Sequence, residues 1–124
     1  MKTLSKLFLI VIVTAAFSIS SCKKTVEPSV TTIEVTSITA QMAMTGGNVT
    51  EDGGADITQR GVCYSRTNAN PTIDDDKTTN GTGTGVYSSQ LSGLFNGATY
   101  YVRAYAVNEV GTSYGAVITF NTLP

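Results

Sequence analysis

The sequence predicts an all-β sandwich of seven short strands in a single domain. From residue 30 onward there is no helical period. Runs rich in β-branched and aromatic residues alternate with Gly, Asn, Asp and Pro at intervals of about 8–15 residues, a spacing typical of sandwiches. The chain of 124 residues suits one domain. The expected strands are residues 31–38, 43–50, 57–65, 77–80, 86–91, 99–108 and 113–121.

Composition excludes several classes of function. Eight Lys and Arg are outnumbered by nine Asp and Glu, so the chain lacks the basic footprint of a nucleic-acid-binding protein. It contains no His, which excludes Ser-His-Asp and Cys-His catalysis and every His-ligated metal site. With only two Cys, a disulfide framework is not expected. The sequence predicts no cofactor.

The strand expected at residues 99–108 alternates most clearly. An unpaired buried guanidinium is costly, so the face that carries Arg103 is expected to point to solvent and the opposite face to pack in the core. The core set comprises Tyr100, Val102, Ala104 and Ala106, and the outward set comprises Tyr101, Arg103, Tyr105 and Val107.

Two other strands are assigned only in part. Val49 is predicted to point inward, and the adjacent pair Gly46-Gly47 is a candidate bulge. In the last strand the residues expected inward are Ala116, Ile118 and Phe120.

Residues 94–108 (LFNGATYYVRAYAVN) resemble the corner and sixth strand of a fibronectin type III domain. Leu94 matches the corner Leu of that family. Tyr100 matches the Tyr of its tyrosine corner, whose hydroxyl bonds to backbone a few residues upstream. The resemblance implies a seven-stranded fibronectin type III, immunoglobulin-like sandwich over residues 30–124. The chain has no Trp, so the core Trp of the family is replaced by something smaller.

Three further segments, residues 46–49, 60–65 and 80–85, resemble a subfamily of fibronectin type III-like domains that is frequent in Bacteroidetes lipoproteins. In the topology of this family the loops at 51–56 and 108–112 lie at the end where the first strand begins. The loop at 74–76 and the corner at 91–98 are expected to point away from that end.

Residues 1–21 are predicted to be a lipoprotein signal peptide. Lys2 and Lys6 precede an apolar run at residues 7–17. This run is shorter than the roughly 20 residues that span a bilayer, but it suits the apolar region of a signal peptide. Small residues then lead to Cys22, which resembles the lipobox of bacterial lipoproteins.

The lipobox resemblance implies cleavage before Cys22 and acylation of this residue. Two or more acyl chains anchor a protein stably to a membrane. An ordinary cleaved signal peptide followed by an incidental Cys is the alternative. Residues 22–29 are then a lipid-anchored linker, with Lys23 and Lys24 at the membrane surface.

The expected location is the outer membrane of a Gram-negative bacterium. In Bacteroidetes-type lipoproteins an acid-rich stretch after the Cys resembles a signal for surface export. Here residues 23–27 contain a single acid. The sequence therefore leaves open whether the anchored domain faces the periplasm or the cell surface.

Tyr101, Arg103 and Tyr105 form a candidate ligand face. Side chains at every second residue of a strand are about 7 Å apart, and Tyr64 joins this face if its phase matches. Stacked aromatic rings beside an Arg suit a sugar ring or a partner protein. Ordinary cross-strand packing, with Arg103 over tyrosine rings, is the alternative and the more frequent use of such residues.

Asp74, Asp75 and Asp76 form an acidic run that is expected to be a solvated loop. Three carboxylates could begin a calcium site, but adjacent residues converge on one ion only in a wrapped loop, and the spacing does not match an EF-hand. A second acidic loop, residues 51–56, is expected at the opposite end. Cys63 is expected to be a buried free thiol.

Together these observations predict a non-catalytic lipoprotein of the cell envelope. Its domain is expected to serve as a protein-interaction or spacer module, because the acids lie mainly in loops and a small sandwich offers no deep pocket for a catalytic pair. The alternative is a carbohydrate-binding accessory protein that uses the tyrosine face. The expected partners are the membrane, through the lipid anchor, and an envelope protein or a glycan, but no nucleic acid.

Overall fold

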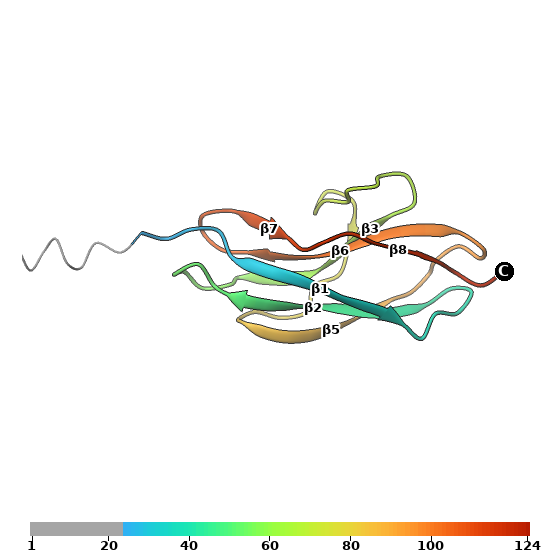
Figure 1. Cartoon of the computed structure of the whole chain (residues 1–124), viewed down its shortest axis with the longest axis horizontal. Coiled ribbons are helices and arrows are strands. Elements are labelled where there is room, and N and C mark those ends of the chain that lie inside the picture. Colours follow the sequence, from blue (N-terminus) through green and yellow to red (C-terminus); the bar gives the residue numbers. More distant parts are fainter. Residues whose placement is uncertain (1–23) are drawn as a thin grey trace, which may run out of the picture.

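The computed structural model describes residues 24–124, which form two antiparallel β-sheets packed face to face (Figure 1). One sheet contains β1 (Ser29–Thr36), β2 (Ala43–Glu51) and β5 (Gly85–Leu91), in the order β1-β2-β5. The other has the order β4-β3-β6-β7, with β8 also paired to β6. Its strands are β3 (Gln59–Ser65), β4 (Asp76–Lys77), β6 (Thr99–Val107), β7 (Thr112–Tyr114) and β8 (Ile118–Asn121). This is the predicted all-β sandwich.

The expected phase of β6 is confirmed on its inner face. Tyr100, Val102, Ala104 and Ala106 are all buried between the sheets. Val49 of β2 and Phe120 of β8 are buried as predicted. Two clusters make up the core. The larger cluster includes Leu94 and the inward residues Tyr100, Val102 and Ala104 of β6. The smaller cluster contains Val49, Ile57, Tyr87 and Ala106.

The prediction of one continuous strand at residues 113–121 is wrong. At the break between β7 and β8, the Thr32 side chain of β1 bonds to the opposite sheet. Its Oγ1 donates a hydrogen bond to the Ala116 carbonyl (2.6 Å) and accepts one from the Ala104 N–H (3.0 Å). The Thr32 hydroxyl thereby satisfies a backbone N–H of β6 that a neighbouring strand would otherwise satisfy. Ala116, which was expected to point inward, is exposed at the break.

The pair Gly46-Gly47 is not itself bulged, because β2 pairs with β5 in continuous register through both residues. The neighbouring irregularity lies between β1 and β2, after the pair Ile33–Gly46. Gly47 instead makes room for a large ring, since a Cβ there would collide with the Tyr87 hydroxyl. Tyr87 of β5 thus fills core volume in a chain that has no Trp.

The N-terminal segment that precedes β1 is attached to the sandwich. The Val26 N–H donates to the Gly53 carbonyl (2.9 Å). The buried Asn108 donates from Nδ2 to the carbonyls of Val26 (2.8 Å) and Asp52 (2.9 Å). Pro28 is buried as well. The predicted linker at residues 22–29 is therefore not a free tether over its second half.

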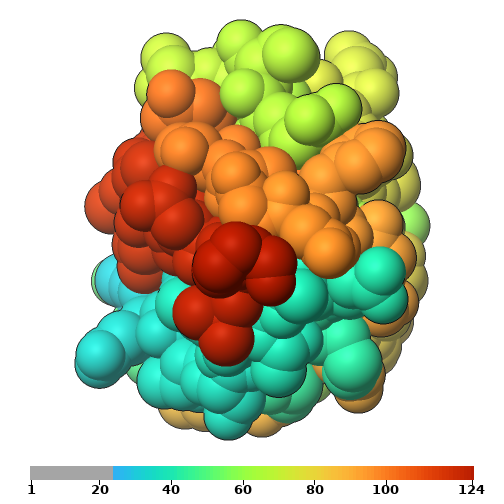
Figure 2. Space-filling model, turned by 90° about the vertical axis from the view of Figure 1, so that its right-hand side faces the viewer, coloured from blue at the N-terminus to red at the C-terminus, as the bar shows by residue number. Residues whose placement is uncertain are grey.

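The two ends of the sandwich are built from different loops. At the N-terminal end the segment before β1 meets the β2–β3 and β6–β7 connections (Figure 1). At the opposite end, here called the far end, the β1–β2 connection, the β5–β6 corner and the C-terminal residues meet (Figure 2). The Leu94 N–H donates to the Gln41 carbonyl, and the Leu123 N–H donates to the Thr39 carbonyl. The expected separation of the two ends is confirmed for these loops.

No helix within residues 24–124 is long and apolar enough to cross a membrane. The predicted signal peptide and Cys22 lie outside the described residues.

Replacing Thr32 by Val is expected to lower the free energy of unfolding by about 1–3 kcal/mol. The variant keeps the shape of the side chain but leaves the Ala104 N–H and the Ala116 carbonyl without their partner. Urea unfolding followed by circular dichroism measures the change. Thr31→Val, at the exposed neighbouring position, is the control and should stay within about 0.5 kcal/mol of the parent. An equal effect of both variants would contradict this role of Thr32.

Candidate functional site

The outer face of β6, predicted as a ligand face, is covered by the β3–β4 connection. Arg103 Nε donates to the Pro71 carbonyl (2.6 Å), and its Nη2 donates to the Asn70 carbonyl (3.4 Å). The guanidinium carbon lies 4.1 Å from the centre of the Tyr114 ring. The Tyr114 hydroxyl in turn accepts a hydrogen bond from the Ile73 N–H (3.1 Å). Arg103 therefore holds a loop in place and is not free to meet a ligand.

Tyr105 is fully buried, so its predicted place on an exposed face is wrong. It pairs with Gly61 of β3, which has no side chain to keep the neighbouring chain away. A Cβ at Gly61 would collide with the Thr78 carbonyl, and this carbonyl accepts a 2.6 Å hydrogen bond from the Tyr105 hydroxyl. Burial raises the pKa of Tyr105. The segment after β4 thus closes over this ring.

Tyr64 lies on the opposite face from Tyr101, Arg103 and Tyr105. It pairs with Val102, which points into the core, and its ring centre is 6.3 Å from that of Tyr100. Tyr101 remains on the outer face, half-buried between Ser65 and Thr119 on the flanking strands. The four residues of the candidate ligand face therefore do not form one surface.

Leu94 and Tyr100 organise the β5–β6 corner. The Tyr100 hydroxyl accepts a hydrogen bond from the Phe95 N–H (2.9 Å), which closes the chain back on itself five positions upstream. Its ring stacks on Phe120, with ring centres 5.7 Å apart. Leu94 is buried in the core beneath. This is the geometry of a tyrosine corner.

Cys63 is a free thiol in the interior of the sandwich. Its Sγ lies 3.4 Å from the Pro71 carbonyl and 3.6 Å from the Arg103 carbonyl, and either carbonyl can accept a hydrogen bond from the thiol. Burial raises the pKa of the thiol to about 11, although the nearby Arg103 charge acts in the opposite direction. The thiolate that nucleophilic chemistry requires is therefore suppressed at neutral pH.

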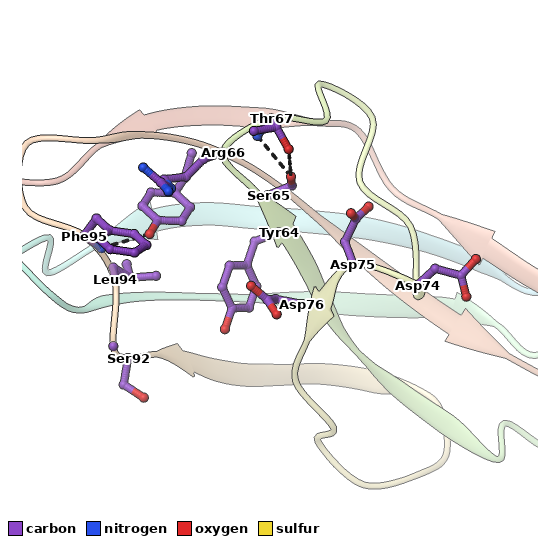
Figure 3. Close-up of a pocket in the computed structure, with 12 residues that line it drawn as sticks. Tyr64, Ser65, Arg66, Thr67, Asp74, Asp75, Asp76, Ser92, Leu94 and Phe95 are labelled. Atoms are coloured by element: carbon purple, nitrogen blue, oxygen red, sulfur yellow. Dashed lines mark hydrogen bonds between the residues drawn. The ribbon is translucent and has the colours of Figure 1, made fainter.

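A hollow of about 430 Å³ opens beside the tyrosine corner; we call it the corner hollow (Figure 3). It is lined by residues 64–67 at the end of β3, by residues 74–76 of the β3–β4 connection, and by residues 92–95 and Tyr100 at the corner. The sequence alone does not reveal this hollow, because its three segments become neighbours only after β3 pairs with β6. The single clue in the sequence is the shared content of aromatic and charged residues.

The walls of the corner hollow differ in charge. On one side the Arg66 guanidinium carbon lies 4.0 Å from the centre of the exposed Phe95 ring. On the other side lie the carboxylates of Asp74, Asp75 and Asp76, with the Tyr64 ring next to Asp76 (Figure 3).

The carboxylate of Asp75 is engaged within its own loop. It accepts hydrogen bonds from Asn68 Nδ2 (3.0 Å) and from the Thr72 N–H (2.9 Å). Asp74 and Asp76 are exposed. Within residues 24–124 no three His, Cys, Asp or Glu side chains converge in a way that could hold a metal ion. The second acidic loop, with Asp52 and Asp56, lines separate hollows at the N-terminal end.

Comparison with known proteins identifies the fold. No protein-family model matches the sequence, and no curated protein matches it. The sensor domain of the anti-sigma factor RsgI4 in Pseudobacteroides cellulosolvens matches with a TM-score of 0.57 and 16% identity, over 81% of this chain and 98% of that one. The fold is a fibronectin type III-like β-sandwich.

Two further solved structures share this sandwich. Domains A168–A170 of titin match with a TM-score of 0.53 and 20% identity, over 79% of this chain and 32% of the titin chain. A computationally redesigned β-sandwich protein matches with a TM-score of 0.53 and 25% identity, over 81% of this chain and 97% of that one. Such distant likenesses establish architecture and leave the binding site to be argued from the residues.

Replacing Arg103 by Met should loosen the β3–β4 connection, because two backbone carbonyls lose their donor. Limited digestion with a protease that cleaves before Asp reports on Asp74–Asp76, and we expect cleavage there to be several-fold faster. Arg66→Met is the matched control, since Arg66 rests on the exposed Phe95 ring. Unchanged cleavage in Arg103→Met would show that this guanidinium does not secure the loop.

Stability is expected to fall as the pH rises above about 9. Burial raises the pKa values of Cys63, Tyr64, Tyr87 and Tyr105 in the folded chain. The unfolded chain then loses these protons first, so their contribution is complete below the unfolded pKa values and is lost as the pH rises through the folded ones. Urea midpoints between pH 8 and 11 measure the decline, which should be shallower in Cys63→Ala. A flat profile would contradict the argument.

Proposed function

We propose that this chain is a non-catalytic lipoprotein of the outer membrane of a Gram-negative bacterium, whose fibronectin type III-like domain acts as a protein-interaction or spacer module. The β-sandwich is this module. Acylated Cys22 supplies the anchor in this proposal. Its partner is an envelope protein. The proposal includes no cofactor and no enzymatic activity.

The attachment of residues 26–28 to the N-terminal end is the observation that carries this proposal. Between Cys22 and Val26, whose N–H makes the 2.9 Å bond to Gly53, the chain reaches at most about 14 Å when fully extended. A lipid on Cys22 would therefore hold the N-terminal end close to the membrane. The far end, with the corner hollow, would face away and be accessible to a partner.

The far end also has surface features that suit a protein partner. Met42, Phe95 and Leu123 are large apolar residues exposed on the loops that meet there. Exposed apolar side chains beside a polar rim are typical of interaction surfaces. The similarity to an anti-sigma factor's sensor domain is compatible with such a role, because sensing also requires a partner or a ligand. The glycan alternative has less support, because it relied on a tyrosine face that includes Tyr105, and this residue is buried.

Proteinase K treatment of intact cells tests the anchor and the membrane side, with Cys22→Ala as control. We expect the parent chain in the membrane fraction and Cys22→Ala in the soluble fraction. Digestion of the parent on intact cells assigns the cell surface, and protection that ends on outer membrane permeabilisation assigns the periplasmic side. An unchanged membrane association of Cys22→Ala would overturn the lipid anchor.

Photocrosslinking in cells tests the direction of the partner. A photoreactive phenylalanine analogue at Phe95 of the far end is expected to capture an envelope protein, whereas the same analogue at Asp56 of the N-terminal end is not. Both positions are exposed, so the comparison is matched for accessibility. Capture confined to position 56 would contradict the proposed orientation.

A further inference from the structure

We infer that the corner hollow receives a basic side chain, Lys or Arg, from the partner protein. This inference rests on the proposed protein-interaction function and specifies where and how the partner binds. Three features of the hollow support it: its aromatic floor, the placement of its charges and its size.

The aromatic floor is formed by Tyr64 and Tyr100. Tyr100 is buried, and its hydroxyl is already occupied by the Phe95 N–H. Tyr64 packs against it at a ring-centre distance of 6.3 Å and is itself only half-buried, so part of this side chain still faces the hollow. A cation within about 6 Å of an accessible tyrosine ring is attracted by the ring's negative face. Arg66 over Phe95, at 4.0 Å, makes such a contact in the wall of the same hollow.

The charges favour a cation next to Tyr64. The lining contains three Asp and one Arg, and the positive charge of Arg66 lies over Phe95, on the other side from the acids (Figure 3). Asp75 is engaged by Asn68 and Thr72, which leaves Asp74 and Asp76 for a ligand. Burial raises the pKa of Tyr64, and the charge of Asp76 adds to this effect, so the field of this carboxylate reaches the ring.

The size of the hollow suits a side chain. A volume of about 430 Å³ lies in the lower part of the range of small-ligand pockets, roughly 300–1,000 Å³. An extended Lys or Arg can lay its aliphatic stem along the Tyr64 ring and place its charged head beside the Asp76 carboxylate, while Asp74 adds negative charge further along the same wall. The carboxylates alone would not define a site. The aromatic floor gives the stem a surface to bury against, which a free metal ion would not use.

The test measures binding of fluorescein-labelled pentalysine to the full chain in non-ionic detergent, by fluorescence polarisation at low salt. Pentalysine acetylated on every side chain is the matched neutral probe. We expect saturable binding of pentalysine and none of the acetylated peptide. In the double variant Asp74→Asn with Asp76→Asn, the affinity should fall about tenfold, since the ion pair at Asp76 and the attraction of the Asp74 charge for the peptide are both lost.

The matched control is the double variant Asp56→Asn with Glu109→Gln. It changes the net charge by the same amount at exposed positions in the other acidic loop and the β6–β7 connection, and its affinity should change less than about twofold. Equal losses in the two double variants would overturn the inference, because binding would then follow net charge alone. Circular dichroism verifies that each variant is folded.

Tyr64→Leu examines the aromatic floor separately, with an expected loss of about threefold to tenfold. Because Tyr64 also packs on Tyr100, its replacement could disturb the core. The single variant Asp76→Asn therefore serves as a second measurement of pentalysine affinity, at an exposed position where the core stays intact. Absence of pentalysine binding, or Tyr64-dependent binding of neutral oligosaccharides in its place, would overturn the inference. Crosslinking from position 95 in cells still reports on the proposed function, so the two can fail independently.

Discussion

The hydroxyl of Tyr87 connects the two sheets, and much of the sandwich is arranged around it. This residue projects from β5 across the core and donates to the Gly61 carbonyl (2.7 Å), with the Tyr105 carbonyl 3.2 Å away. Its ring needs the space above Gly47. Thr32 makes the complementary connection from β1 to β6. Within residues 24–124 no buried side-chain nitrogen or oxygen lacks a hydrogen-bond partner. Hydroxyl-to-backbone bonds therefore support a core that contains no Trp, because each satisfies a polar group that burial would otherwise penalise.

The same rule explains how the two ends of the molecule are built. At the N-terminal end, the Asn108 amide satisfies carbonyls of Val26 and Asp52 and so joins the incoming chain to the fold. At the far end, the Tyr100 hydroxyl satisfies the corner and leaves a polar hollow beside it. In the proposed function, a lipid tether at the first end leaves the second end exposed to a partner. Anchoring and recognition would then be separated by the length of the sandwich, so that a change at one end need not disturb the other.

The candidate ligand face shows how far a strand pattern can be interpreted. Period-2 alternation correctly separated the core side of β6 from its outer side, since side chains on a strand must alternate. It could not show that the outer side is covered. Tyr105 is buried because Gly61 lies opposite and the chain after β4 crosses above it. Arg103 is half-buried because the β3–β4 connection needs a donor for its carbonyls. Tyr64 points the other way because its register with Val102 places it inward.

The sequence by itself determined the class of fold, the inward face of β6 and the place of the corner, because alternation, turn residues and a local tyrosine motif are properties of neighbouring residues. The break between β7 and β8, the attachment of Val26 and the corner hollow were decided only by the tertiary structure. Each depends on a contact between segments far apart in the chain: Thr32 with Ala116, Asn108 with Val26, and β3 with the corner after β5. Such contacts form only once the sheets have packed, and no local pattern records which backbone group a distant side chain will satisfy.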